Sequence, residues 1–227
     1  MSWLERTELL VQKEGIEKLK KANILVVGLG GVGSYAAEFI ARAGVQKITL
    51  VDGDVFDETN KNRQLPALDS TIGKSKAQVL ASRLKDINKD IELVVLEEFL
   101  SPERAYEIVS KEFDYVLDCI DSITPKVNLI VAARRKKVKI ISSMGAGGKL
   151  DVTKIKVADI GKTKNCTMAR ILRKRLKERK VNKGVKAVYS EEIQISKSLK
   201  ITDGKILLWH NKLYASSIWF ASSSLCY

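Results

Sequence analysis

Apolar and polar residues alternate along the first two thirds of the chain in a pattern typical of strands that are each followed by a helix. Short apolar runs predict strands at 22–27, 47–51, 91–96, 115–119 and 138–142. Between them, apolar residues recur at helical spacing over 35–43, 74–87, 101–111 and 126–136. This alternation predicts an α/β fold built on a doubly wound, mostly parallel sheet.

The pattern changes at both ends of this region. A helical extension over 3–19 precedes the first strand, where it can pack on the sheet or on another subunit. After Ser143 come a glycine-rich segment, a short alternating strand over 154–157, and a strongly basic helix from about 168 to 179. No internal repeat is present, so repeat architectures are excluded.

A glycine-rich loop joins the first strand to the first helix of the alternating region. Its sequence is Gly-Leu-Gly-Gly-Val-Gly, with glycines at Gly28, Gly30, Gly31 and Gly33. Glycines let backbone N–H groups approach a phosphate, and the helix N-terminus attracts the same anion. Asp52 ends the second strand roughly 20 residues later, the spacing at which a carboxylate meets ribose hydroxyls in Rossmann-like folds. The sequence therefore predicts a nucleotide site, and the alternative is a turn that only packs a helix on a sheet.

Three polar segments follow strands of the predicted sheet. They are the glycine loop, Asp52, and the run of residues 118–121 that contains Asp121. Ligands of such sheets bind at the carboxyl ends of the strands, so these segments should converge on one crevice.

Arg63 and Lys76 favour ATP chemistry over hydride transfer. Negative charge develops on the phosphates when pyrophosphate leaves, and two cations beside a glycine loop can clamp it. Asp121 can hold a magnesium ion. Each residue alone can also be a solvated surface charge.

Composition limits the class of protein. The 227 residues, 45% of them hydrophobic, are enough to bury the core of one α/β domain. No leader-type segment precedes the first strand, and no apolar run approaches the roughly 20 residues that span a bilayer, so we expect a cytoplasmic protein without membrane contact. Cys119, Cys166 and Cys226 form no Cys-x-x-Cys pair, and we expect neither a structural metal nor a disulfide.

Positive charge is concentrated rather than spread evenly. Forty Lys and Arg against 27 Asp and Glu give a formal net charge of +13. A second basic run lies at 134–137, and the main cluster contains Arg170, Arg173, Lys174, Arg175, Lys177, Arg179, Lys180 and Lys183. Such clustering favours the phosphate backbone of a nucleic acid as partner. A membrane surface or a purely solubilising role remains open.

Four short motifs together resemble one family. They are Asp-x-Asp at 52–54, Asn-x-x-Arg-Gln at 60–64, Gly-x-x-Lys at 73–76 and Asp-Cys-x-Asp at 118–121. Over about residues 4–160 the chain is similar to the ubiquitin-activating-enzyme-like adenylating superfamily. The resemblance implies that ATP is bound through Asp52, Asp54, Asn60, Arg63 and Lys76, and that Asp121 coordinates Mg²⁺.

The same resemblance implies a homodimer. In it Arg6 would reach into the ATP site of the other subunit and act in catalysis with Arg63 and Lys76. The sequence around Arg6 equally fits a charge on a helix surface.

Within that superfamily, segments 142–163 and 189–192 look most like the tRNA threonylcarbamoyladenosine dehydratases. This resemblance implies that ATP adenylates the threonyl carboxylate of the modified adenosine, after which attack from within the side chain expels AMP and closes a ring. No covalent enzyme intermediate is needed, and we assign no role to Cys166.

Two other functions stay open. One is adenylation of the C-terminus of a ubiquitin-like sulfur carrier, with a carrier or desulfurase as partner, and the other is tRNA binding without catalysis.

The resemblance ends near residue 197. We therefore predict one adenylating domain over 1–196 and an atypical tail over 197–227. Several codons can encode each residue of the tail. For one choice of codons, translating the gene one base later from residue 209 onward gives Gly-Thr-Thr-Ser-Phe-Met-Pro, a segment of the kind found in the family. We hypothesise a frameshift near residue 208, and the alternative is a divergent terminal strand and helix.

Overall fold

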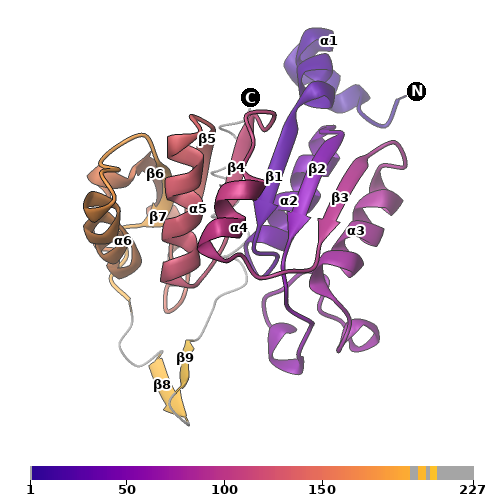
Figure 1. Cartoon of the computed structure of the whole chain (residues 1–227). Coiled ribbons are helices and arrows are strands. Elements are labelled where there is room, and N and C mark those ends of the chain that lie inside the picture. The colour runs from indigo at the N-terminus through magenta and orange to yellow at the C-terminus, as the bar shows by residue number, and fades with distance from the viewer. Residues whose placement is uncertain (1, 195–198, 203–204, 209–227) are drawn as a thin grey trace.

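A seven-stranded sheet forms the centre of the protein. The computed structural model describes residues 2–194 and the backbone of 199–202 and 205–208 (Figure 1). The strands are β1 (Asn23–Val27), β2 (Lys47–Val51), β3 (Glu92–Leu96), β4 (Tyr115–Asp118), β5 (Lys139–Ser143), β6 (Ile155–Asp159) and β7 (Lys186–Ser190). Their order is β3-β2-β1-β4-β5-β7-β6, with all neighbours parallel except β6 on β7. The predicted doubly wound, mostly parallel sheet is confirmed.

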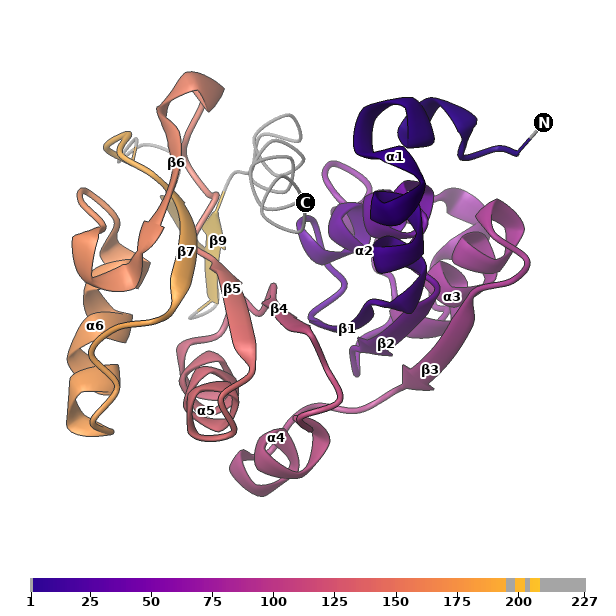
Figure 2. The ribbon, with the colours of Figure 1, turned by 90° about the horizontal axis from the view of Figure 1, so that it is seen from above.

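Helices cover both faces of this sheet. They are α1 (Glu5–Lys21), α2 (Gly33–Ala43), α3 (Lys76–Ile87), α4 (Pro102–Ile108), α5 (Ile123–Arg135) and α6 (Thr167–Glu178). Short 3₁₀ turns are η1 (Glu58–Asn60), η2 (Asp69–Thr71), η3 (Val152–Lys154) and η4 (Ile160–Lys162). Viewed from above, α1, α2 and α3 lie on one side of the sheet, and α4, α5 and α6 on the other (Figure 2).

Alternation along the strands builds two apolar layers. In β1, Ile24 and Val26 pack with α2 and α3, whereas Leu25 and Val27 pack with α5. Successive strand side chains point to opposite faces, so a sheet covered on both sides reads as an uninterrupted apolar run. This is why the strands were visible in the sequence.

Local chemistry sets the helix bounds. α3 begins at Lys76 rather than 74 because the Ser75 hydroxyl accepts a hydrogen bond from the Gln78 N–H, 3.4 Å away, as an N-cap. α4 ends at Ile108, three residues before the predicted end, because Val109 takes an extended conformation. α1 begins at Glu5 and is interrupted at Gln12, where φ is 61°.

β7 was not predicted as a strand. It fills the position beside β5 and pairs with β6 from Ile155↔Ser190 to Asp159↔Lys186. β8 (Leu199–Thr202) and β9 (Lys205–Leu208) form a separate antiparallel pair. Of the predicted atypical tail, 197–227, the structure describes only the backbone of these two strands. Residues 209–227 lie outside the described residues, so the frameshift stays a hypothesis. In the part of the chain that the structure describes, no helix is long and apolar enough to cross a membrane.

Candidate nucleotide-binding site

The glycine loop lies at the carboxyl end of β1, where strand order changes direction between β2 and β4. Gly28 has φ +85°, and a Cβ there would lie 2.9 Å from the Cys119 carbonyl carbon and oxygen. A Cβ on Gly33 would lie 1.8 Å from the Gly28 carbonyl oxygen. Only glycine fits at either position, so the backbone of the loop stays open to a ligand.

Asp52 holds the loop from the neighbouring strand. Its Oδ2 accepts a hydrogen bond from the Leu29 N–H at 2.5 Å, and its Oδ1 accepts one from the Asp54 N–H at 2.8 Å. Burial raises the pKa of Asp52, while these N–H groups and Lys76 oppose that shift. The carboxylate is thus fixed beside the loop, as its predicted ribose contact requires.

Lys76 reaches the same place from the N-terminus of α3. Its Nζ lies 2.9 Å from Asp54 Oδ2, and its side chain is only 8% exposed. The Lys76 N–H donates to the Asp54 carbonyl at 3.0 Å, so main chain and side chain both bind the segment after β2. Among the described residues, this buried cation has one ion-pair partner, the exposed carboxylate of Asp54.

Arg63 lies against the glycine loop at Gly31. A Cβ on Gly31 would lie 3.3 Å from Arg63 Cγ, and the guanidinium donates to the Thr59 carbonyl at 3.0 Å. Burial lowers the pKa of Arg63, and the negative charge of Asp121 opposes this. Asp121 itself is exposed, and its Oδ1 accepts a hydrogen bond from Ser122 Oγ at 3.2 Å.

Asn60 and Gln64 shape the loop that carries Arg63. The Asn60 carbonyl accepts the N–H groups of Arg63 and Gln64, and its Oδ1 accepts that of Asp57 at 3.3 Å. Gln64 is 6% exposed, and its Oε1 has no hydrogen-bond partner among the described residues. Gln64 lies beside Gly30, so a ligand or a water molecule at the glycine loop can donate the missing hydrogen bond to its Oε1.

Phe99 was missed by the sequence analysis. Its ring atoms would lie 2.7 and 2.9 Å from a Cβ on Gly53, yet the residue is 73% exposed. An uncovered aromatic ring next to Gly53 offers an apolar face beside the segment that follows β2. The only signal in the sequence was its position three residues after a strand.

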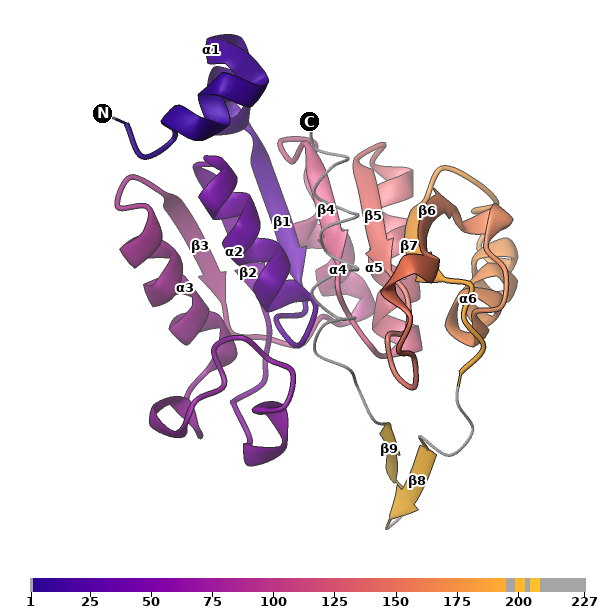
Figure 3. The same ribbon diagram turned by 180° about the vertical axis from the view of Figure 1, so that it is seen from behind.

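Arg6 is not brought to this site within one chain. It lies in the first turn of α1 and is exposed. α1 leads into the amino end of β1, and Figure 3 shows it at the end of the sheet opposite the loops that follow β1 and β2. Any contact of Arg6 with a nucleotide must therefore be made in another subunit.

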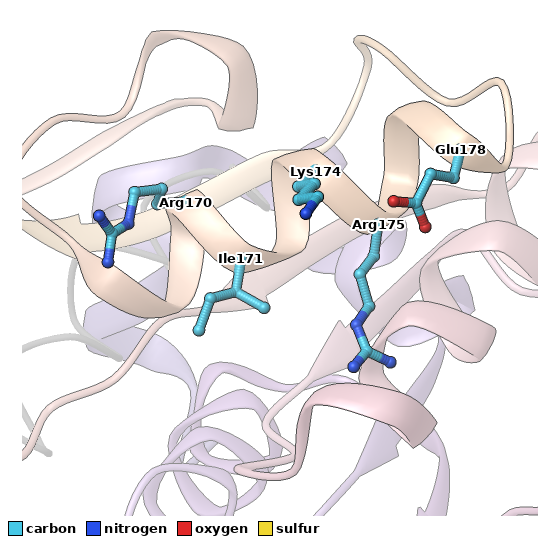
Figure 4. A pocket seen from close by; sticks show the side chains of 5 residues that line it. All are labelled: Arg170, Ile171, Lys174, Arg175 and Glu178. Carbon is cyan, nitrogen blue, oxygen red and sulfur yellow. The ribbon is translucent and has the colours of Figure 1, made fainter.

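The basic cluster follows α6 and the turn after it. A depression of about 600 Å³ is lined by Arg170, Ile171, Lys174, Arg175 and Glu178, all from α6 (Figure 4). Arg175 reaches toward α5, with Nη1 3.5 Å from Thr124 Oγ1. The other exposed members are Lys177, Arg179, Lys180 and Lys183.

Arg173 differs from the rest of this cluster. Its Nη1 donates to the Thr163 hydroxyl, to the Thr163 carbonyl at 3.1 Å and to the Ile160 carbonyl at 3.4 Å. Through these contacts Arg173 joins α6 to η4 and to Thr163, the residue that follows η4. Arg173 is therefore a structural residue and is set apart from the exposed cations.

Cys119 lies against the glycine loop but is chemically inert. Burial raises the pKa of its thiol to about 12. A thiol that stays protonated is a poor nucleophile. Cys119 lies next to Gly28 because the backbone after β4 packs closely against the glycine loop.

Comparison with known proteins gives the family and the fold of the chain. The ThiF family model matches residues 4–189. The tRNA threonylcarbamoyladenosine dehydratase of Bacillus subtilis is 42% identical over 190 residues, which cover 84% of this chain and 75% of the relative. Crystal structures of the Escherichia coli tRNA N6-threonylcarbamoyladenosine dehydratase in complex with ATP and with AMP superimpose with a TM-score of 0.89. They have 36% identity and cover 97% of this chain and 90% of theirs. With its glycine loop, paired cations and doubly wound sheet, the chain belongs to the ThiF family.

Proposed function

We propose that this protein uses ATP to dehydrate and cyclise threonylcarbamoyladenosine in tRNA. The observation that carries the proposal is the meeting of Asp52, Lys76, Arg63 and Asp121 around the glycine loop. This arrangement belongs to a chain similar to dehydratases whose crystal structures contain ATP and AMP.

Each residue has a role that its position supports. The Asp52 carboxylate accepts the ribose hydroxyls, and the glycine loop offers N–H groups to the phosphates. Lys76 exchanges its contact with Asp54 for the triphosphate, and Arg63 approaches the phosphates from beside Gly31. Asn60 holds the turn that carries Arg63, so its effect on ATP includes positioning.

The reaction consists of two displacements. A carboxylate oxygen of the substrate attacks the α-phosphorus of ATP, and pyrophosphate leaves. A group of the same side chain then attacks the activated carbonyl carbon and loses its proton, and AMP leaves with the former carboxylate oxygen. Lys76 and Arg63 stabilise the charge that develops in the first step. No thiol takes part, which agrees with the inert Cys119.

Magnesium fits the residues at this site. Among the described residues, no group of three or more His, Cys, Asp or Glu side chains could hold a metal. Mg²⁺ commonly binds through one or two carboxylates together with substrate phosphates and water. The exposed Asp121 would supply that carboxylate, and the bound ion would neutralise phosphate charge.

The remaining partners are proposed on the surface of the molecule. The exposed cations of α6 bind the tRNA phosphate backbone. Two chains form a homodimer in which Arg6 of one subunit completes the site of the other. The proposed setting is the cytoplasm.

The test is AMP formation from ATP with three substrates supplied separately. These are tRNA that carries threonylcarbamoyladenosine, the same tRNA without the modification, and a small carrier protein ending in glycine. We expect AMP only with modified tRNA, together with loss of water from the nucleoside by mass spectrometry. AMP formation that requires the carrier protein would replace this function by sulfur-carrier activation. ATP binding without AMP from any substrate would leave a tRNA-binding protein.

A further inference from the structure

An ion pair with no exposed surface lies directly behind the proposed ATP site. Lys126 Nζ is 3.0 Å from Asp118 Oδ1, and both side chains are 0% exposed. Asp118 ends β4, and Lys126 lies in the first turn of α5. Removing two charges from water costs about as much as their attraction returns, so fold stability alone gives little reason for such a pair.

The contacts of the pair hold the turn between these two elements and join it to β5. Lys126 Nζ donates to the Ile120 carbonyl at 2.8 Å and to the Asp118 carbonyl at 3.4 Å. Asp118 Oδ1 accepts the Ile120 N–H at 3.2 Å, and Oδ2 accepts the Ser142 hydroxyl at 2.6 Å. The turn is thus held by a lysine from α5, a carboxylate from β4 and a serine from β5.

This turn forms part of the nucleotide site. Asp121 follows Ile120 directly, and its exposed carboxylate is held by the hydroxyl of the adjacent Ser122. On the other side of the turn, the Cys119 backbone is the surface against which Gly28 packs. Displacing the Ile120 carbonyl would therefore move the carboxylate expected to bind Mg²⁺.

We propose that Lys126, through its buried pair with Asp118, is a positioning residue that fixes the 119–122 turn so that Asp121 faces the nucleotide-bound cation. The inference rests on the proposed function of Asp121. Lys126 touches neither ATP nor the cation, and its effect is transmitted by the Ile120 carbonyl.

The test uses a neutral pair, Lys126→Met with Asp118→Asn, which leaves no unpaired buried charge. ATP affinity is measured by calorimetry with and without Mg²⁺, and thermal melting is recorded on the same samples. We expect a melting temperature close to that of the parent, and a loss of about tenfold or more in the affinity gained from Mg²⁺. Asp121→Asn serves as the reference for complete loss of that gain.

Two further variants keep the result interpretable. Ser142→Ala removes only the donor to Asp118 Oδ2 and should produce a smaller shift in the same direction, even if the neutral pair fails to fold. Lys47→Met with Glu92→Gln removes an exposed pair, 3.4 Å apart, at the amino end of the sheet, and should leave the Mg²⁺ gain unchanged.

The outcomes separate the two proposals. If the parent gains affinity from Mg²⁺ and Asp121→Asn does not, but the neutral pair and Ser142→Ala behave like the parent, Lys126 is only structural and the inference is wrong. A parent that gains nothing from Mg²⁺ removes the role of Asp121 in the proposed function, and this inference with it.

Discussion

At the scale of single residues, the site is held ready by contacts that a nucleotide would replace or complete. Lys76 is nearly buried yet pairs only with the exposed Asp54 carboxylate among the described ion pairs. Gln64 Oε1 is buried without a hydrogen-bond partner in that same part of the chain. Lys76 therefore suits a ligand that carries negative charge, and Gln64 suits a ligand that donates a hydrogen bond.

Arg63→Ala and Lys76→Ala should each lower the rate of AMP formation by about 10²-fold or more. Each change removes a charge interaction that strengthens as pyrophosphate leaves. The measurement is single-turnover AMP release at saturating ATP with modified tRNA. Lys47→Ala, an exposed lysine that begins β2 at the other end of the sheet, is the control. Unchanged turnover in both site variants would remove their assigned roles.

Cys119→Ala should retain AMP formation, because the thiol is a packing group. With a pKa raised to about 12, the thiol stays protonated and resists iodoacetamide between pH 7 and 9. The same shift lowers stability at high pH, since the unfolded thiol ionises near 9.0 while the folded one does not. Cys119→Ala should therefore lose less stability than the parent between pH 8 and 10, measured by urea unfolding. Rapid alkylation at pH 7 would contradict this description.

The residues at the site were predictable to different degrees for physical reasons. Gly28 and Asp52 directly follow β1 and β2, and parallel strands bring their carboxyl ends together, so their sequence position was enough. Arg63 and Lys76 lie farther along the segment that follows β2 and were singled out by their charge. Lys126 was overlooked because a single lysine on a helix is ordinarily solvated. Its spacing to Ile130 and Ala133 placed it on the buried face of α5, and that spacing was the available signal.

At the scale of elements, α6 combines two kinds of basic residue. Arg173 supports η4 from within, whereas Arg170, Lys174 and Arg175 line an open depression. The helix sequence shows the positive charge but does not separate these roles, because both depend on which neighbours pack against each face. β7 was missed for a similar reason: it is five residues long and follows a charged turn, so its pairing with β5 and β6 determines its conformation.

Reversing the charge of the three exposed cations of the depression should weaken tRNA binding. The slope of log affinity against log salt concentration should also become shallower, by roughly one unit for each phosphate that is no longer neutralised. The variant is Arg170→Glu, Lys174→Glu and Arg175→Glu. ATP affinity should persist, because these side chains lie on α6, away from the glycine loop. Affinities are measured over a series of salt concentrations.

The control for this variant carries the same change in net charge elsewhere. Lys47→Glu, Lys89→Glu and Lys111→Glu alter exposed residues at or just before the amino ends of β2, β3 and β4. A salt slope equal to that of the parent in the α6 variant would make α6 an ordinary solvated helix. Equal weakening in both variants would reduce the effect to net charge.

At the scale of the whole molecule, the position of α1 requires two chains if Arg6 acts in catalysis. Mixing Arg6→Ala with Lys76→Ala subunits should then restore activity, because one of the two sites in each heterodimer contains both intact side chains. Activity is compared with each variant alone at equal concentration after subunit exchange. Heterodimers that form but are no more active than their components would restrict Arg6 to a surface role.

The order of strands also has a consequence for biosynthesis. β1 lies inside the sheet, between β2 and β4. β4 comes so much later in the chain that the Asn23 N–H and the Asp114 carboxylate that accepts it are 91 residues apart. A nascent chain on the ribosome therefore exposes the apolar edge of β1 until β4 has emerged, a period in which long-range pairing is slow and aggregation competes. The glycine loop packs against the Cys119 backbone, so ATP binding can stabilise the chain only after β4 and Cys119 have been made and cannot assist the earliest folding steps.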